Sequence, residues 1–280
     1  MYEHLNTFLT RAKPACWCAL GLLAGLSACI VGQRGFVEFS AEYPLFEVQA
    51  VRFDLPDTPM TVRGDPLADQ VELAGYWFSV GGTVAVAEAN AAEPSLAWAR
   101  ESGFAELSAL VPADLRELVD LEVGEITVPE SLDVELVTGL GNIEVAHVIG
   151  NVSVDIETGN IEIFGGDEGV AARTHFGDIE VRSPGAIDAY TAQGEVSIAQ
   201  TGIGGNAIFA EAIGGSIRVE LLADANLALD IHAGGDIRVQ TSTISTVSTG
   251  MFHREVGNAT VAVELYAPTG SVTVVLVDPD

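Results

Sequence analysis

The sequence predicts an all-β fold: a single-stranded parallel β-helix, or β-solenoid, with coils of about 17–21 residues and an irregular β-rich N-terminal cap. Two observations predict it. A short phrase, Gly-x-[Ile/Val]-x-[Val/Ile], returns at nearly constant spacing through the second half of the chain. Within each phrase apolar and polar residues alternate, as they do in a strand with one buried face. A β-sandwich or a β-propeller is the alternative, but these folds need longer strands or blades of about 40 residues.

The phrase begins at eight glycines whose spacings are 17, 18, 18, 17, 21, 20 and 35 residues: Gly124, Gly141, Gly159, Gly177, Gly194, Gly215, Gly235 and Gly270. Glycine supplies the backbone angles that a tight corner needs. A strand of about five residues followed by a corner describes part of one solenoid coil. Since a coil cannot bury its apolar face alone, we expect each coil to stack on the next at about 4.8 Å.

Equivalent residues of successive coils should form ladders along the axis. We expect one buried ladder of Ile143, Ile161 and Ile179, and a second of Val145, Ile163 and Val181. The outward positions read Glu144, Glu162, Glu180, Ser197, Arg218 and Arg238, and the positions before the buried ladder read Asn142, Asn160, Asp178, Glu195, Ser216 and Asp236. Three glutamates about 4.8 Å apart repel unless cations or solvent screen them. A low-affinity Ca²⁺ stripe at Glu144, Glu162 and Glu180 is one interpretation, because oxygen ligands suit hard cations, and a solvated acidic face is the other.

The first part of the body predicts atypical end coils that cover the core. Alternating segments indicate strands at residues 36–39, 46–55, 60–64, 82–88 and 96–99. We expect a loop at Ala87–Ser95, and a helical turn or a loop at Ala113–Asp120. Trp77, Phe78 and Trp98 are candidate members of this cap, with an aromatic ligand shelf as the alternative interpretation.

The regular period is interrupted near the C-terminal end. Gln240–Asn258 predicts a polar excursion before the last coil, Ala259–Val277. The chain therefore divides into a leader at residues 1–28, β-rich N-terminal coils and cap at residues 29–117, and a regular repeat domain at residues 118–280.

The leader has the layout of a secretory signal peptide. Arg11 and Lys13 precede a short apolar run that ends in small residues, and this run is too short for a comfortable transmembrane span. Its end, "LSAC" at residues 26–29, resembles the lipobox of bacterial lipoproteins. That resemblance implies cleavage before Cys29 and lipidation of Cys29, and Ile30 after it favours sorting to the outer membrane. Cleavage at another site, or an uncleaved anchor, is the alternative.

Cysteine usage limits the chemistry of the body. The only cysteines are Cys16, Cys18 and Cys29, all in or at the end of the leader. The mature body therefore has no disulfide framework, thiolate nucleophile or cysteine metal site. We interpret Cys16 and Cys18, which flank Trp17 in the apolar run, as small apolar residues and not as a redox pair.

The body is strongly acidic. The chain has 12 basic and 40 acidic residues, a formal charge of −28, and removal of residues 1–28 leaves 10 and 39, a charge of −29. Lys13 is the only lysine. Nucleic acid and anionic lipid need a basic footprint, so this surface argues strongly against direct binding of either. It suits salt-rich or divalent-cation-rich surroundings, or simply provides solubility.

The repeats resemble the bacterial "putative adhesin" family of β-strand-repeat proteins, a domain of unknown function. The matching segments lie between Leu118 and Val277 and read "VTGLGNIEV", "IETGNIEI", "THFGDIEV", "AGGDIRV" and "APTGSVTV". The resemblance implies a β-helix carried outside the cytoplasm on a lipid or a membrane helix. The family has no agreed catalytic residues, so it implies none here.

Catalytic motifs are sparse. Some β-helices are polysaccharide lyases or hydrolases with clustered carboxylates and basic residues on one face. Asp155, Glu157, Arg173, His175 and Asp188 could gather in this way, although those enzymes have longer coils and large loops around a cleft. The histidines show no paired metal-ligand spacing, and no nucleophile elbow, phosphate loop or dinucleotide fingerprint is present.

The sequence thus predicts a non-enzymatic, lipid-anchored cell-envelope protein, an acidic solenoid that serves as a surface, adhesion or structural interaction module. Its expected partners are the membrane, through the lipid anchor, and an envelope protein or polysaccharide. No cofactor is expected, calcium being the exception left open above. A carbohydrate-active enzyme on the same scaffold is the alternative.

Overall fold

Strands make up most of the described chain. A computed structural model describes residues 32–202, 206–222, 226–241, 245–256, 259 and 261–277, and over these ranges it contains twenty-one strands and one helix. The all-β prediction is therefore confirmed. Gly32–Asp280 forms one compact unit. The leader and Cys29 lie outside the described residues, and no helix among the described residues is long and apolar enough to cross a membrane.

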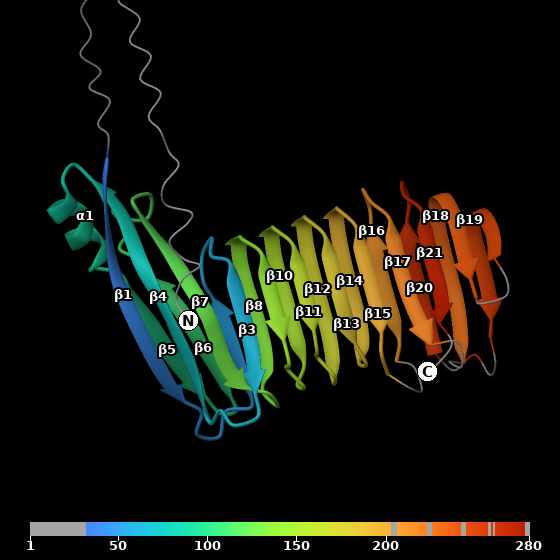
Figure 1. Ribbon diagram of the computed structural model, residues 1–280, viewed down its shortest axis with the longest axis horizontal. Helices are drawn as coiled ribbons and strands as arrows, with labels where there is room; N and C mark the ends of the chain where they lie inside the picture. Colours follow the sequence, from blue (N-terminus) through green and yellow to red (C-terminus); the bar gives the residue numbers. More distant parts are fainter. Residues whose placement is uncertain are drawn as a thin grey trace, which may run out of the picture. The chain divides into compact units, whose positions relative to one another are not determined.

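The strands pair into two stacks (Figure 1). Stack A contains, in spatial order, β5 (Ser95–Glu101), β6 (Phe104–Leu110), β2 (Ala50–Asp54), β8 (Asp133–Leu140), β10 (Val152–Thr158), β12 (Gly169–Phe176), β14 (Ala186–Gln193), β16 (Ile208–Ala212), β20 (Val261–Ala267), the first half of β18 (Leu227–Gln240) and the second half of β19 (Ser245–Glu255). Stack B contains β1 (Gln33–Pro44), β4 (Gln70–Gly81), β7 (Val119–Pro129), β3 (Met60–Asp65), β9 (Ile143–Ala146), β11 (Ile161–Phe164), β13 (Ile179–Ser183), β15 (Val196–Gln200), β17 (Ile217–Leu222), β21 (Val272–Val277), the second half of β18 and the first half of β19. The stacks are joined because β18 and β19 each contribute one half to either stack. Pairing is antiparallel only near the ends of the stacks, where β1 pairs with β4, β4 with β7, β5 with β6 and β18 with β19. All other neighbouring strands of the described residues are parallel.

From β6 to β17, consecutive strands alternate between the stacks, so each strand of one stack and the next strand along the chain form one layer, called here a rung. In the regular part each residue pairs with the residue one coil length away in the next rung. Ile161, for example, pairs with Ile143 on one side and with Ile179 on the other. These three side chains are at most 1% exposed. Both predicted buried ladders are thus present, and their apolar side chains belong to the continuous core between the stacks.

The glycine of the repeated phrase is required by close stacking at a corner. Gly159, Gly177 and Gly194 have φ of +143°, +153° and +150°, which L side chains rarely adopt. A Cβ added at these positions would lie 2.1, 1.9 and 2.0 Å from the carbonyl oxygen of the equivalent glycine one rung earlier, which for Gly159 is Gly141. Any side chain would therefore push two rungs apart, so the phrase begins with glycine for a structural reason.

The polar residue after that glycine satisfies the backbone at the corner. The side chain of Asn142 accepts a hydrogen bond from the backbone N–H of Asn160 at 3.0 Å. The Asn160 side chain does the same for Asp178 at 2.9 Å, and the Asp178 carboxylate does so for Glu195 at 2.7 Å. Unpaired backbone donors at a corner are costly, so Asn and Asp here hold successive rungs together.

The rungs at the C-terminal end do not follow the order of the sequence. The rung of β20 and β21 lies between the β16–β17 rung and β18, which it contacts on both halves (Figure 1). The segment Gln240–Asn258 leaves the parallel period, as predicted, but most of its described residues form strand β19, which pairs antiparallel with β18. The predicted axial order is wrong at one step, since Thr273 lies between Arg218 and Arg238.

The N-terminal end holds the only helix of the described residues, and here the sequence prediction is wrong. The strand expected at 82–88 and the loop expected at Ala87–Ser95 are replaced by α1 (Val84–Ala91). The Thr83 side chain caps it by accepting a hydrogen bond from the Val86 N–H at 3.2 Å, and Ala87 and Ala91 are buried. The high helix propensity of alanine, together with this cap, outweighs the short apolar alternation.

The strand boundaries test two further expectations for the N-terminal part of the chain. Only residues 50–54 of the strand expected at 46–55 are extended. Residues 113–118 form turns before β7 begins at Val119, which agrees with the non-helical alternative.

Candidate functional site

A groove crosses the rungs on the outward surface of stack A, called here face A. It has a volume of 710 Å³, and its lining comes from β2, β6, β8, β10, β12, β14, β16 and β20. The hollow follows from side-chain size in one outward row, which reads Glu135, Ser153, Ala171, Asp188, Phe209 and Glu264 in successive rungs. Ser153 and Ala171 are short, so the surface sinks between the longer residues at either end of the row.

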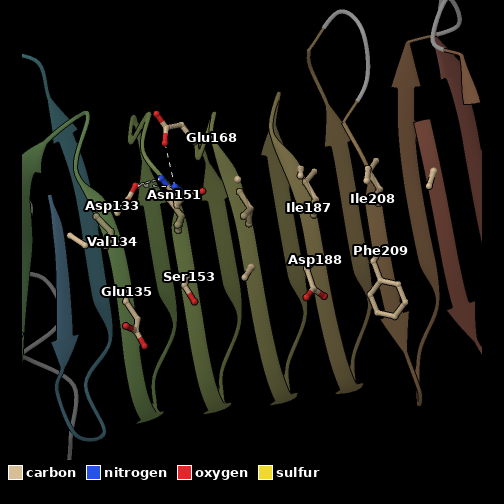
Figure 2. A pocket seen from close by; sticks show the side chains of 18 of the residues that line it. Asp133, Val134, Glu135, Asn151, Ser153, Glu168, Ile187, Asp188, Ile208 and Phe209 are labelled. Atoms are coloured by element: carbon tan, nitrogen blue, oxygen red, sulfur yellow. Dashed lines mark hydrogen bonds between the residues drawn. The ribbon is translucent and has the colours of Figure 1, made fainter. Parts of the chain in front are cut away.

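One rim of the groove is a hydrogen-bonded acidic cluster (Figure 2). The Asn151 side-chain amide donates to Asp133 Oδ1 at 3.1 Å and to Glu168 Oε2 at 3.3 Å, and the Asn151 backbone N–H donates to Asp133 Oδ1 at 2.7 Å. Asn151 thus fixes two carboxylates of neighbouring rungs at the end of the groove. With Glu135, Asp188 and Glu264 in the lining, the groove presents carboxylates around a floor of small side chains.

The far end of the groove carries an aromatic residue. Phe209 on β16 projects from face A and is 42% exposed (Figure 2). It also lines a second hollow of 450 Å³, together with Asp188. The two hollows are therefore neighbours on one surface, and Asp188 and Phe209 border both.

The second hollow contains most of the residues that the sequence suggested for carbohydrate chemistry. Asp155, Arg173, His175 and Asp188 line it, whereas Glu157 does not. Arg173 Nη2 donates to Asp188 Oδ2 at 3.1 Å, so the only arginine of this hollow is engaged by one of its carboxylates. Both side chains are about half exposed, with exposed fractions of 58% and 43%. The arrangement offers a charged, open surface and encloses no carboxylate pair.

The predicted glutamate ladder exists in register on the outward surface of stack B, called here face B. Glu162 pairs with Glu144 on one side and with Glu180 on the other, and all three are exposed. Over the described ranges, no group of three or more His, Cys, Asp or Glu side chains is placed to hold a metal ion. The Ca²⁺ stripe stays a prediction, and the ladder itself is an observed row of like charges.

This row predicts a response to salt. We expect the thermal unfolding midpoint of the protein to rise with NaCl up to about 1 M, because screening relieves repulsion over the acidic surface. Replacing Glu144, Glu162 and Glu180 together by Gln should raise the midpoint at low salt and reduce the salt response. A specific Ca²⁺ site would instead add a response that saturates at millimolar concentration and disappears in the triple variant. If such a response survives the triple change, this ladder does not bind Ca²⁺.

The candidate aromatic shelf is divided between different surfaces. Trp77 and Phe78 are adjacent on β4 and so point to opposite sides of the strand, and Trp77 is buried against Phe39, with ring centroids 6.3 Å apart. Trp98 lies on β5 in stack A, stacked on Tyr43 at 4.7 Å. Burial raises the pKa of the Tyr43 hydroxyl. Trp77 and Trp98 pack in or against the core, as the first interpretation predicted, whereas Phe78 does not belong to this cluster.

The groove itself was not identified from the sequence. A signal was available, because Glu135, Ser153 and Ala171 are each 18 residues apart, and aligning the coils would have revealed the fall in side-chain size. The rim of the groove could not be predicted in this way. Asp133, Asn151 and Glu168 lie at corners, and there the alternation of the repeated phrase does not determine which way a side chain points.

No protein-family model matches the sequence, and no curated protein matches it. Among solved structures, a putative cell adhesion protein from Clostridium sporogenes is similar, with 13% identity and a TM-score of 0.32 over 86% of this chain and 99% of the other. A putative adhesin from Bacteroides fragilis is similar with 12% identity and a TM-score of 0.30 over 85% and 97% of the two chains. Membership of the strand-repeat family predicted from the repeats stays a prediction.

Proposed function

We propose that this protein is a non-enzymatic interaction module of the bacterial cell envelope. In this proposal the two stacks are the walls of a single-stranded parallel β-helix, a lipid on Cys29 holds the protein to the outer membrane, and face A receives a partner. The observation that carries the proposal is the 710 Å³ groove across the rungs. A rigid stack of rungs positions its outward side chains at fixed spacing, which suits recognition of an extended chain.

The chemistry of the groove indicates what kind of chain it would hold. Its floor of small side chains allows a backbone to approach closely, and its carboxylates favour positively charged groups. Phe209 at one end offers an exposed ring to an apolar or cationic group. An extended basic segment of an envelope protein fits these features. A neutral polysaccharide would leave the carboxylates without a charged partner.

A steric substitution tests this function. Ala171→Arg fills the middle of the groove, so we expect binding of a lysine-rich extended peptide to weaken at least about tenfold, equivalent to about 1.4 kcal/mol. Ala99→Arg on β5 is the matched control, since it makes the same change in charge at an exposed position outside the groove. Calorimetric titration of the full-length protein measures both. Equal weakening by the two variants would mean that the peptide binds only to the general negative charge.

A carbohydrate-active enzyme is the second candidate, because Asp155, Arg173, His175 and Asp188 share one hollow. Its test is turnover of polyuronides or peptidoglycan fragments by the protein. Turnover that is lost on replacing Arg173 or His175 would favour the enzyme. The Arg173–Asp188 ion pair and the openness of face A favour the binding module instead.

A further inference from the structure

Face B has an uneven distribution of charge along the stack. Its first outward row reads, in spatial order, Glu144, Glu162, Glu180, Ser197, Arg218, Thr273 and Arg238. The three glutamates form a ridge on one half, and the two arginines occupy the other half. Ser197 on β15 lies at the middle of these seven rungs, and the row continues beyond them to Thr61 at one end and Val247 at the other.

The second outward row has the opposite arrangement of charge about the same middle rung. It reads Ala146, Phe164, Arg182, Ala199, Glu220, Val275 and Gln240 in the same rungs. Arg182 lies one rung before the middle and Glu220 one rung after it. Phe164 and Val275 are placed symmetrically one rung further out, and the middle residue, Ala199, is small.

The arginine half of this face is hollow. A depression of 380 Å³ is lined by Ser197, Ser216, Arg218, Arg238, Ser271 and Thr273, and also by the acidic residues Glu195 and Asp236. Its lining therefore combines serine and threonine side chains, two arginines that lie two rungs apart, and two carboxylates, of which Asp236 pairs with Arg238. On the other half, Glu144 and Glu180 are also two rungs apart, so ridge and depression have the same spacing of about 9.6 Å.

We propose that two copies of this chain associate through face B, with a two-fold axis that runs along β15 past Ser197 and Ala199. Rotation about this axis leaves the strands of the second copy running in the same direction as those of the first, but it reverses the order of the rungs of the second copy. It places Glu180 against Arg218 of the second copy, and Glu144 against Arg238 of the second copy. In the second row it places Arg182 against Glu220, and Phe164 against Val275.

The proposed contact is self-complementary, as a two-fold interface must be. Each charged pair named above occurs twice, and the ridge of each copy enters the depression of the other. Arg218 pairs with Glu220 and Arg238 with Asp236 in the single chain, so the contact extends existing pairs into a network. In these two rows only Ser197 and Ala199 meet their own copies, and their small size permits close approach. The exposed Glu195 at the corner of the same rung also faces its own copy.

The size of the contact predicts a reversible dimer. Seven rungs about 4.8 Å apart and strands of about five residues give a patch of about 34 by 16 Å, hence about 1,100 Å² for both copies. This value lies at the lower end for specific interfaces, and its rim is charged. Face A stays free, so this inference does not depend on the proposed function.

A thiol on the axis tests the geometry. In the detergent-solubilised full chain under mild oxidation, Ser197→Cys should form a disulfide-linked dimer because the two introduced thiols face each other. Thr61→Cys is the matched control, since Thr61 belongs to the same outward row but lies four rungs from the axis and faces no copy of itself. The unsubstituted chain controls for the leader cysteines. Cross-linking of both variants to the same extent, or of neither, would overturn the proposed axis.

Charge reversal supplies an independent measurement. Glu180→Arg removes two units from a formal charge of −28, so general repulsion between copies falls, yet the proposed contact predicts at least a tenfold loss of dimer affinity. Adding Arg218→Glu should restore the affinity, because the pair is re-formed with its signs exchanged. Sedimentation of the detergent-solubilised chain measures both variants. Stronger association of the single variant, or no recovery in the double variant, would refute the interface.

Discussion

Ile161→Asp will unfold the regular rungs or lower the free energy of unfolding by at least about 4 kcal/mol. Ile161 is fully buried, and its partners in register are Ile143 and Ile179, which are also buried. A carboxylate there has no counter-charge and no water, and the substitution also removes an apolar side chain from a close-packed core. Chemical denaturation followed by circular dichroism measures the loss.

The adjacent residue gives the matched control. Glu162 lies between two like charges on the exposed side of the same strand. Glu162→Lys should therefore leave the free energy of unfolding unchanged or raise it slightly, because it replaces repulsion by attraction across the rungs. Similar destabilisation by both substitutions would show that the alternation of buried and exposed side chains is assigned wrongly.

Gly177→Ala should cost at least about 3 kcal/mol, the second-largest effect of a single substitution expected here. The added Cβ would lie 1.9 Å from the carbonyl oxygen of Gly159, and φ at this position is +153°. Both are backbone constraints, so rotation of a side chain cannot relieve them. The stack must separate locally, which weakens the hydrogen bonds between two rungs. The thermal unfolding midpoint measures the effect.

Gly82→Ala serves as the control for this change. A Cβ added to Gly82 would meet no atom within 4 Å. Alanine also restricts the unfolded chain more than glycine does, so this variant should be as stable as the parent protein or slightly more stable. If Gly177→Ala were tolerated equally well, close stacking at the corner would not explain the repeated glycine.

The positions of the side chains within the regular rungs could be predicted because the relevant pattern is local. Alternation fixes which residues of a strand face the core, and a spacing of 17 or 18 residues brings equivalent residues into register. The ladders of Ile161 and Glu162 follow from these two rules. The hydrogen-bonding role of Asn160 was not predicted, because it depends on how a corner turns.

The groove of face A illustrates an intermediate case. Its row of Glu135, Ser153 and Ala171 obeys the repeat, so its composition was fixed by the sequence. Its depth depends on the side chains of all eight strands that line it. For the hollow that contains Arg173, the sequence suggested which residues could gather, and the structure added the ion pair to Asp188 that engages the guanidinium.

The sequence by itself determined the all-β class, the inward and outward sides of the regular strands, and the acidic, almost lysine-free surface. The tertiary structure alone decided the order of the end rungs, which places Thr273 between Arg218 and Arg238 and thereby gives face B its symmetric spacing. The physical reason is the range of the interactions. A strand's alternation is set by neighbours in the chain, whereas the choice of partner strand depends on hydrogen bonds between segments that can be more than 80 residues apart, as for Met60 and Asn142.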